Sequence, residues 1–256
     1  MSTPHAARPR GASPRRRAGA LARFPLGVLV VSWQYLWRVT ALHRTETRGD
    51  ARDLPPELPA GLCDERSKPL SDGAGPMFHR RFSVRIEGSP MTPVELTDAV
   101  MANLNRVAPS TVAVFHKIVG ADGPPSVGDE YRVQMPGPWD GPVRVIHRDP
   151  VSFRFGTLQG HLEAGQIEFR SREAGGRLVF EIEAWSRAGD RLADLLYSRL
   201  RVAKEMQFNM WVHFCLRAAA VAGGRVAGGV NIDTRDIPGE LCLEARGPRD
   251  PAGPAR

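Results

Sequence analysis

Few residues of this 256-residue chain combine type and spacing in a way that could do chemistry, and His161 and Glu163 come first. They lie two positions apart in the glycine-bounded run Gly156–Gly165 (GTLQGHLEAG), where residues i and i+2 can point to the same side. An imidazole beside a carboxylate can act as an acid–base pair. Alternatively, the glycines supply turn geometry and both polar side chains hydrogen-bond the loop backbone. No nucleophile or metal ligand lies nearby in the sequence. We therefore assign no catalytic residue and treat the pair as candidate ligand contacts.

Three more residues are candidates for contacting a ligand. Trp139 lies in a loop rich in Pro and Gly, where its indole could close the mouth of a pocket or plug the end of the core. His116 shares one face of an expected strand with Val112, Val114 and Ile118. It would be a polar point in an apolar cavity if that face meets a helix, or else a histidine satisfied by a neighbour. Tyr131 lies on the apolar face of the next expected strand.

The cysteine and histidine spacings predict neither a metal site nor a cofactor. Cys63, Cys215 and Cys242 are far apart, and no Cys-x-x-Cys or Cys/His spacing typical of zinc is present. Cys215 falls on the apolar side of an expected helix. A sparse, odd set of cysteines fits a reducing compartment, so we expect the protein to be cytoplasmic.

The positive charge of the chain is concentrated at its N-terminus. The formal net charge is +7, but residues 1–23 carry six arginines and no carboxylate. Pro, Ala and Gly fill the rest of this segment, a composition that cannot bury enough surface to order itself. We expect residues 1–23 to form a disordered basic tail. No motif for specific nucleic-acid recognition accompanies the charge.

Residues 24–44 form the most apolar run, with apolar positions at helical spacing. Gln34 and Arg38 interrupt the run, and Leu26–Val31 is too short to span a bilayer. We expect an amphipathic helix that covers a patch of the main domain. The alternative is weak contact with a membrane surface through residues 24–42, which would make the protein peripheral. Residues 45–76, rich in Pro and Gly, are interpreted as a linker.

Residues 77–224 are predicted to form one α+β domain. Period-two alternation begins at Phe78, and Thr92-Pro93-Val94-Glu95 has the pattern of a capping box with proline at the first helical position. Runs with strand periodicity follow, joined by short turns that force antiparallel neighbours. A long apolar stripe over Leu192–Phe214 then predicts a helix that ends at Gly223-Gly224. Residues 225–256 are expected to be a disordered or loosely packed tail.

This order predicts the helix-grip architecture. A curved antiparallel sheet of about seven strands would wrap round the long C-terminal helix, with the segment 24–44 as an N-terminal helical appendage. Such a sheet can leave a mostly apolar gap beneath the helix, where ligand sites are favoured. The other face of the sheet would carry arginines and glutamates, either as solvated cross-strand ion pairs or as a surface for an anionic partner.

The run GTLQGHLEAG, followed by Glu168-Phe169 and Glu183–Arg187 (EAWSR), resembles domain-of-unknown-function family nineteen-ninety of bacteria and plants. The segment Pro136–Arg144 is similar to the actinobacterial branch of that family. The resemblance covers about residues 77–224 and implies a relationship to the START and birch-pollen-allergen superfamily of lipid and small-molecule binders. It implies no activity, cofactor or catalytic residue.

Three functions follow as hypotheses. The first is a non-enzymatic binder of a small apolar or amphipathic molecule held between sheet and helix. The second is an enzyme of the cyclase or hydrolase type that uses His161 and Glu163. The third is a peripheral membrane or scaffold protein that acts through residues 24–42.

Overall fold

The computed structural model describes residues 41–109, 113–135, 140–189 and 202–244. The described strands are β1 (Leu42–Arg48), β2 (Ala74–Glu87), β3 (Val114–Val119), β4 (Glu130–Gln134), β5 (Asp140–Arg148), β6 (Ser152–Thr157), β7 (Glu163–Ala174), β8 (Arg177–Ala188) and β9 (Arg225–Ile237). The described helices are α2 (Pro93–Ala102), α3 (Leu104–Val107), α5 (Val202–Val221) and α6 (Leu241–Glu244), with short 3-10 turns η1 (Ala51–Asp53), η2 (Ala60–Leu62) and η3 (Leu70–Asp72).

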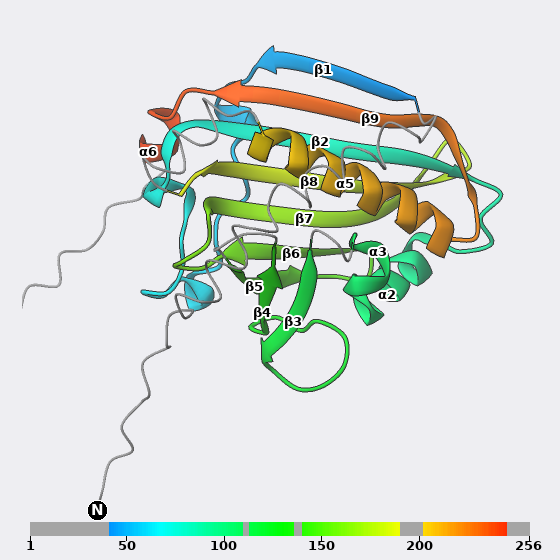
Figure 1. Ribbon diagram of the computed structural model, residues 1–256, viewed down its shortest axis with the longest axis horizontal. Coiled ribbons are helices and arrows are strands. Elements are labelled where there is room, and N and C mark those ends of the chain that lie inside the picture. Colours follow the sequence, from blue (N-terminus) through cyan, green and yellow to red (C-terminus); the bar gives the residue numbers. More distant parts are fainter. Residues whose placement is uncertain (1–40, 110–112, 136–139, 190–201, 245–256) are drawn as a thin grey trace, which may run out of the picture.

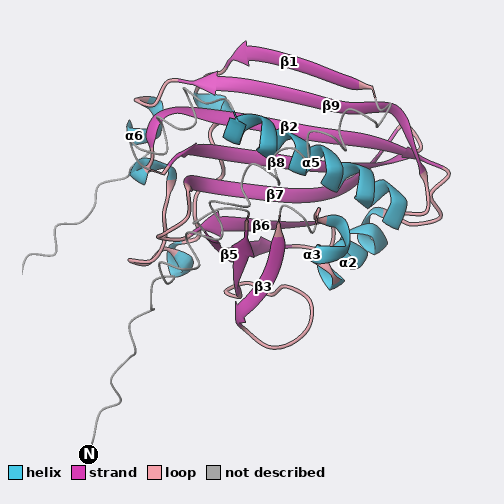
Figure 2. Ribbon diagram, viewed as in Figure 1, coloured by secondary structure: helices cyan, strands magenta, loops and turns pink. Residues whose placement is uncertain are grey.

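One mixed sheet of nine strands dominates the described part of the chain (Figure 2). Its order is β1-β9-β2-β8-β7-β6-β5-β4-β3. Every neighbouring pair is antiparallel except β1 and β9, which run parallel. The α+β class is confirmed, but the predicted count of about seven antiparallel strands is too low, because β1 and β9 extend the edge beyond β2.

Strand β9 corrects the expectation of a loose tail over residues 225–256. Val230 and Ile232 are almost fully buried in the main core, and Ile237 is buried in a second apolar cluster. Val230 and Ile232 alternate with Asn231 and Asp233, so a short period-two signal of a strand is present in the sequence. Residues 225–237 therefore belong to the folded domain.

The segment 45–76 is also more than a linker. It begins within β1 and then crosses the outer face of the sheet, where Ser67 forms an isolated bridge with Leu158. The backbone N–H of Lys68 donates to Thr157 O at 2.9 Å, and Gln166 Nε2 donates to Pro56 O at 3.0 Å. The prolines predict irregular backbone correctly. They carry no information about these distant partners.

Helix α2 begins as its sequence predicts. Thr92 caps the helix by accepting from the Glu95 N–H, and the Glu95 carboxylate accepts in return from the Thr92 N–H. The capping box and the proline at the first turn are thereby confirmed. The helical path breaks at Asn103 and resumes as α3, and the inward residues of both helices are buried in the core.

Helix α5 lies across one face of the sheet, with α2 and α3 near one of its ends (Figure 1). The helix stops before Gly223, whose φ of 66° suits the left-handed turn expected there. The predicted start of this helix, over residues 190–201, lies outside the described residues. Helix α5 is also followed by β9 and α6, so it is not the last element of the fold.

The core between α5 and the sheet is rich in aromatic side chains. Phe214 is fully buried and contacts Phe169 and Phe180, at ring-centroid distances of 5.0 and 6.0 Å. Phe169 also stacks on Phe153 at 4.8 Å. Aromatic pairs at such distances add stabilisation beyond the area that they bury.

The outer sheet face carries the predicted cross-strand ion pairs, but several are covered rather than solvated. Arg144 pairs with Glu130 at 2.8 Å, and Arg154 pairs with Glu168 at 3.0 Å; all four residues are buried. The cause is the segment that crosses this face, because Arg144 also donates to Leu62 O and Asp64. The segments 1–23 and most of 24–44 lie outside the described residues, whereas residues 42–44 begin β1.

Candidate functional site

A cavity of about 120 Å³ lies between the concave face of the sheet and α5. It is partly open to solvent, and its wall is mostly apolar. The described residues that line it are Phe115, Val133, Met135, Val143, Phe155, Thr157, His161, Leu162, Glu163, Gly165, Gln166, Ile167, Phe169, Ala184, Trp185, Ser186, Met210 and Trp211. The wall therefore draws on β3 to β8, the loop before β7, and α5.

Helix α5 closes the cavity with Met210 and Trp211. The Trp211 ring stands edge-on to Phe169, with centroids 5.8 Å apart. Its indole N–H is buried and has no hydrogen-bond partner among the described residues. From the sheet, Ala184 contributes a small side chain on the same face as the core residue Ile182, two positions earlier in β8. Trp185 points the opposite way and stacks on His79 beyond the sheet.

His161 stands at the polar end of this wall, in the turn between β6 and β7. Gly160, with φ of 95°, allows the turn, and the His161 N–H donates to Leu158 O at 3.0 Å. The Glu163 N–H donates to His161 Nδ1 at 2.9 Å, and the Glu163 carbonyl oxygen lies 3.1 Å from the same atom. The imidazole thus bonds loop backbone, as one sequence interpretation expects, and also lines the cavity.

The surroundings of His161 favour its neutral form. Burial lowers the pKa of the imidazole, the Glu163 carboxylate and its backbone oppose this, and the Lys68 ammonium lowers the pKa further. Lys68 is itself buried, and its Nζ donates to the His161 carbonyl oxygen at 2.6 Å. The net effect is a pKa below the ordinary value of a histidine.

Glu163 is half-buried beside His161 at the first position of β7, and it also lines the cavity. Two residues on, the Gly165 N–H donates to Thr157 Oγ1 at 2.9 Å, which ties this end of β7 to β6. The structure therefore brings together two of the five residues that the sequence singled out.

Of the other three predicted contacts, His116 and Tyr131 do not share this position. His116 is exposed on β3, where its Nε2 lies 3.3 Å from Gln134 Oε1, and its neighbour Phe115 points inward instead. Of the two interpretations of His116, a contact with the ligand beneath the helix is wrong, because the larger apolar side chain of Phe115 takes the buried position. The other interpretation, a histidine satisfied by a neighbour, agrees with its contact with Gln134. Tyr131 is buried edge-on to Phe155 at 5.6 Å but is not among the lining residues. Trp139 lies outside the described residues.

Sequence reasoning missed Lys68 and Trp211. Trp211 is three positions before Phe214, so its place on the buried face of the helix could have been read from the spacing. Lys68 lies in the segment interpreted as a linker, and no local pattern connects it with His161.

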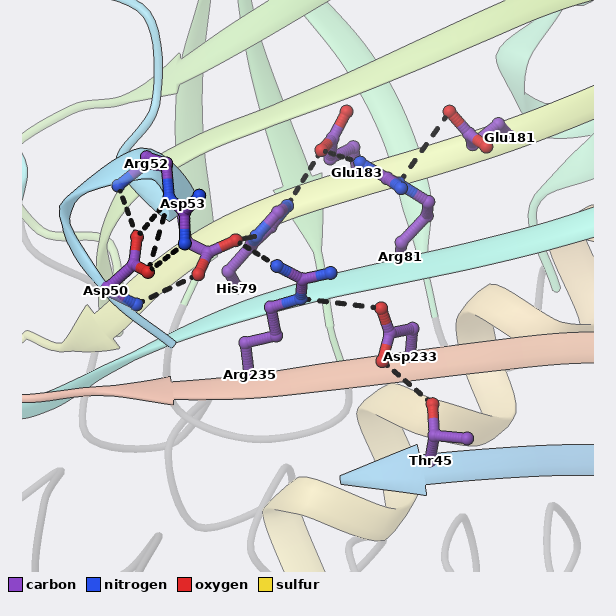
Figure 3. Close-up of polar contacts among 10 residues, drawn as sticks. All are labelled: Thr45, Asp50, Arg52, Asp53, His79, Arg81, Glu181, Glu183, Asp233 and Arg235. Carbon is purple, nitrogen blue, oxygen red and sulfur yellow. Dashed lines mark hydrogen bonds and ion pairs between the residues drawn. The ribbon is translucent and has the colours of Figure 1, made fainter. Parts of the chain in front are cut away.

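A separate polar cluster lies on the outer face of the sheet (Figure 3). The His79 imidazole stands between two carboxylates, with Nε2 2.7 Å from Glu183 Oε1 and Nδ1 3.4 Å from Asp53 Oδ1. Arg81 also donates to Glu183 at 2.8 Å, and Arg235 donates to Asp53 at 2.8 Å. The cluster joins η1, β2, β8 and β9 and lies away from the cavity, because these side chains point to the opposite face of the sheet.

The described residues contain no group of three or more His, Cys, Asp or Glu side chains arranged to hold a metal ion. None of their helices combines the length and the apolar character needed to cross a bilayer.

The fold and cavity define an α+β protein in which a helix lies on a curved sheet above a partly open, mostly apolar space. The chain belongs to the family described as domain of unknown function 1990 (DUF1990), whose model matches residues 76–218, more than half of the chain. The family resemblance read from the sequence is thereby confirmed, and β1 and β9 fall outside the matched segment.

Solved structures with a similar chain path include three that differ widely in sequence. The KanY protein matches with a TM-score of 0.42 and 9% identity, over 59% of this chain and 99% of that one. The di-domain ARO/CYC StfQ from the steffimycin biosynthetic pathway matches with a TM-score of 0.41 and 10% identity, over 59% and 51%. Ara h 8.0201 matches with a TM-score of 0.39 and 12% identity, over 57% and 99%. No curated protein matches the chain.

Proposed function

We propose that this domain binds a small apolar or amphipathic molecule in the cavity between the sheet and α5. The observation that carries the proposal is the cavity of about 120 Å³ with its mostly apolar wall. An apolar cavity of roughly 150 Å³ is large enough to take up benzene. The space therefore suits one aromatic ring or the end of an alkyl chain, and its partial opening lets a larger molecule extend outward.

The distribution of polar groups supports an amphipathic guest. Phe155, Phe169 and Met210 supply apolar contacts, while His161 and Glu163 place polar atoms at one end of the same wall. An apolar body with one polar end would match this arrangement, since binding sites commonly combine an apolar lining with a few polar groups that orient the ligand.

Native mass spectrometry of gently purified protein tests the proposal, with Ala184→Leu as the variant that fills the cavity. We expect wild-type protein to carry a small molecule or to take up an added alkylbenzene, and the Leu side chain at position 184 to prevent both. Ala113→Leu, in the buried core but absent from the cavity lining, controls for general overpacking. Ligand-free wild-type protein that takes up no probe would refute the proposal.

A second candidate is an acid–base enzyme of the cyclase or hydrolase type. The observation in its favour is that His161 and Glu163 line one cavity and that backbone hydrogen bonds hold the imidazole. The double replacement of His161→Asn with Glu163→Gln tests it on any substrate that wild-type protein turns over. Turnover that survives the double replacement would remove both residues from the chemistry.

A separate proposal concerns residues 24–42, through which an otherwise cytoplasmic protein would make weak contact with a membrane surface. Liposome flotation of the full chain against a truncation tests it. The truncation has to end at residue 40, because Leu42 begins β1. Equal flotation of the two proteins would rule this contact out.

A further inference from the structure

The proton of neutral His161 is assigned by its contacts to Nε2. The Glu163 N–H is a fixed donor, and it points at Nδ1 from 2.9 Å, so Nδ1 must offer a lone pair. A proton on Nδ1 would serve the Glu163 carbonyl oxygen at 3.1 Å but would set two N–H groups against each other at the shorter contact. The shorter contact decides the tautomer.

The Nε2 edge of the ring then faces Gly141 of β5, next to the cavity lining. A Cβ placed on Gly141 would lie 3.1 Å from His161 Nε2 and 3.2 Å from the terminal methyl of Met135, which lines the cavity. The ring edge therefore lies over the bare backbone of Gly141, beside that methyl group. No described residue hydrogen-bonds Nε2.

Three residues that line the cavity carry a ring N–H without a hydrogen-bond partner among the described residues: Trp185, Trp211 and, through Nε2, His161. The Trp185 ring stacks on His79 at the other face of the sheet, so His161 and Trp211 are the two that a ligand in the cavity could meet. A bound ligand displaces water from the cavity, and an N–H that then has no partner is costly, so a ligand atom that accepts from it is favoured over an apolar one.

We infer that the ligand is a neutral, mostly apolar molecule that presents a carbonyl or similar acceptor oxygen to His161 Nε2. The inference rests on the proposed binding function and narrows it to a ligand class. A neutral imidazole donates one hydrogen bond without demanding a negative charge, so a ketone, ester or lactone fits this position. His161 is then the residue that determines ligand specificity.

The test uses two probes of nearly the same shape, acetophenone and α-methylstyrene, which differ by a carbonyl oxygen in place of a methylene group. Both are titrated into wild-type protein and the His161→Phe variant. We expect the replacement to weaken acetophenone by about three- to tenfold, which is the usual worth of one net hydrogen bond, and to leave α-methylstyrene nearly unchanged. Comparing the two probes removes general changes in the cavity from the result.

Two further variants sharpen the test. His161→Gln puts an amide N–H at about the reach of Nε2, so it should keep part of the acetophenone affinity that His161→Phe loses. His116→Gln changes a histidine on the exposed face of β3 and should alter neither probe. Circular dichroism confirms that each variant is folded.

Nitrogen-15 NMR of the histidine rings gives an independent readout. We expect neutral His161 to carry its proton on Nε2 at neutral pH, and the Nε2 signal to move with acetophenone but not with α-methylstyrene. A proton on Nδ1, or equal loss of both probes in His161→Phe, would overturn the inference and leave the binding function standing. Failure of wild-type protein to bind either probe would overturn both.

Discussion

At the scale of single residues, His79 and Glu183 show how the outer face of the sheet is held together. The His79 imidazole bridges Glu183 and Asp53, and these residues come from β2, β8 and η1 (Figure 3). Arg235 adds β9 to the cluster through Asp53. Charge pairing here joins the matched family segment to the segments before and after it. Removing Glu183 or Asp53 would take away one of the two carboxylates beside the buried His79.

The pKa of Glu183 makes the contribution of this cluster measurable. Burial opposes the charge of Glu183, but the hydrogen bonds from His79 and Arg81 outweigh burial and lower the pKa from 4.5 to about 2. A lowered carboxylate pKa stabilises the fold above about pH 4.5, and this stability is lost as the pH falls towards 2. We expect Glu183→Gln to reduce that loss by on the order of 1 kcal/mol, a value that allows for solvent screening.

Chemical denaturation at pH 7, 5, 4 and 3 measures this effect. The control is Glu173→Gln, because Glu173 is exposed at the far end of β7. If the Glu183→Gln and wild-type proteins lost the same amount of stability between pH 5 and 3, the lowered pKa of Glu183 would not be the source of this pH dependence.

The sequence identified part of the site at this scale and could not identify the rest. His161 and Glu163 were recognisable because glycines surround them and the two are neighbours in the chain. His116 was misplaced because β3 has apolar residues at both parities, Val114 and Ile118 on one side and Phe115 on the other. Only packing against Phe155 and the cavity decides between the two faces.

At the scale of elements, Gly165 shows why the start of β7, just after the turn that carries His161, needs glycine. Its φ is 150°, and a Cβ at this position would lie 1.9 Å from the Trp185 carbonyl oxygen of the neighbouring strand β8. We expect Gly165→Ala to lower the free energy of unfolding by about 2–3 kcal/mol or more, through backbone strain and overpacking. Gly61→Ala is the control, since nothing lies within 4 Å of the added methyl group. Equal stability of the two variants would mean that the β7–β8 contact is looser than described.

Strand β9 gives a second prediction about elements. Ile232 is 2% exposed against the main core, whereas its neighbour Asn231 is exposed. Ile232→Ala should lower the free energy of unfolding by about 2–5 kcal/mol, as large-to-small changes in packed cores do. Asn231→Ala should change it by no more than about 0.5 kcal/mol. Urea denaturation of both variants checks this. Small, equal effects would support the loose tail that the sequence alone suggested.

Local sequence signals predicted where elements begin and end, but not which elements pair with each other in space. The capping box of Thr92 and Glu95 and the stop at Gly223 follow from short-range chemistry and are present in the structure. The parallel pairing of β1 with β9 joins residues almost 190 positions apart, such as Leu42 with Val230. No local pattern specifies such a pair, so β1 was interpreted as the end of a helix and the start of a linker, and β9 as part of a tail.

At the scale of the whole molecule, two sets of elements have different roles. The matched family segment supplies the sheet and most of α5, and with them the cavity. Strands β1 and β9, with the segment over the outer face, enlarge the sheet and cover buried ion pairs. The helix-grip arrangement was predictable because the order of its elements, a strand, a helix, several strands with short connections and a long helix, can be recognised from local periodicity. The extensions were not, because their partners are remote in sequence.

The most direct test of the central claim is a methyl NMR titration with a small aromatic molecule. Met135 and Met210 line the cavity, while Met77 is buried in the second apolar cluster on the other side of the sheet. We predict saturable shifts of the Met135 and Met210 methyl signals in wild-type protein, no shift of Met77, and no response in Ala184→Leu. Unchanged Met135 and Met210 signals, or shifts that persist in Ala184→Leu, would contradict a binding site between the sheet and α5.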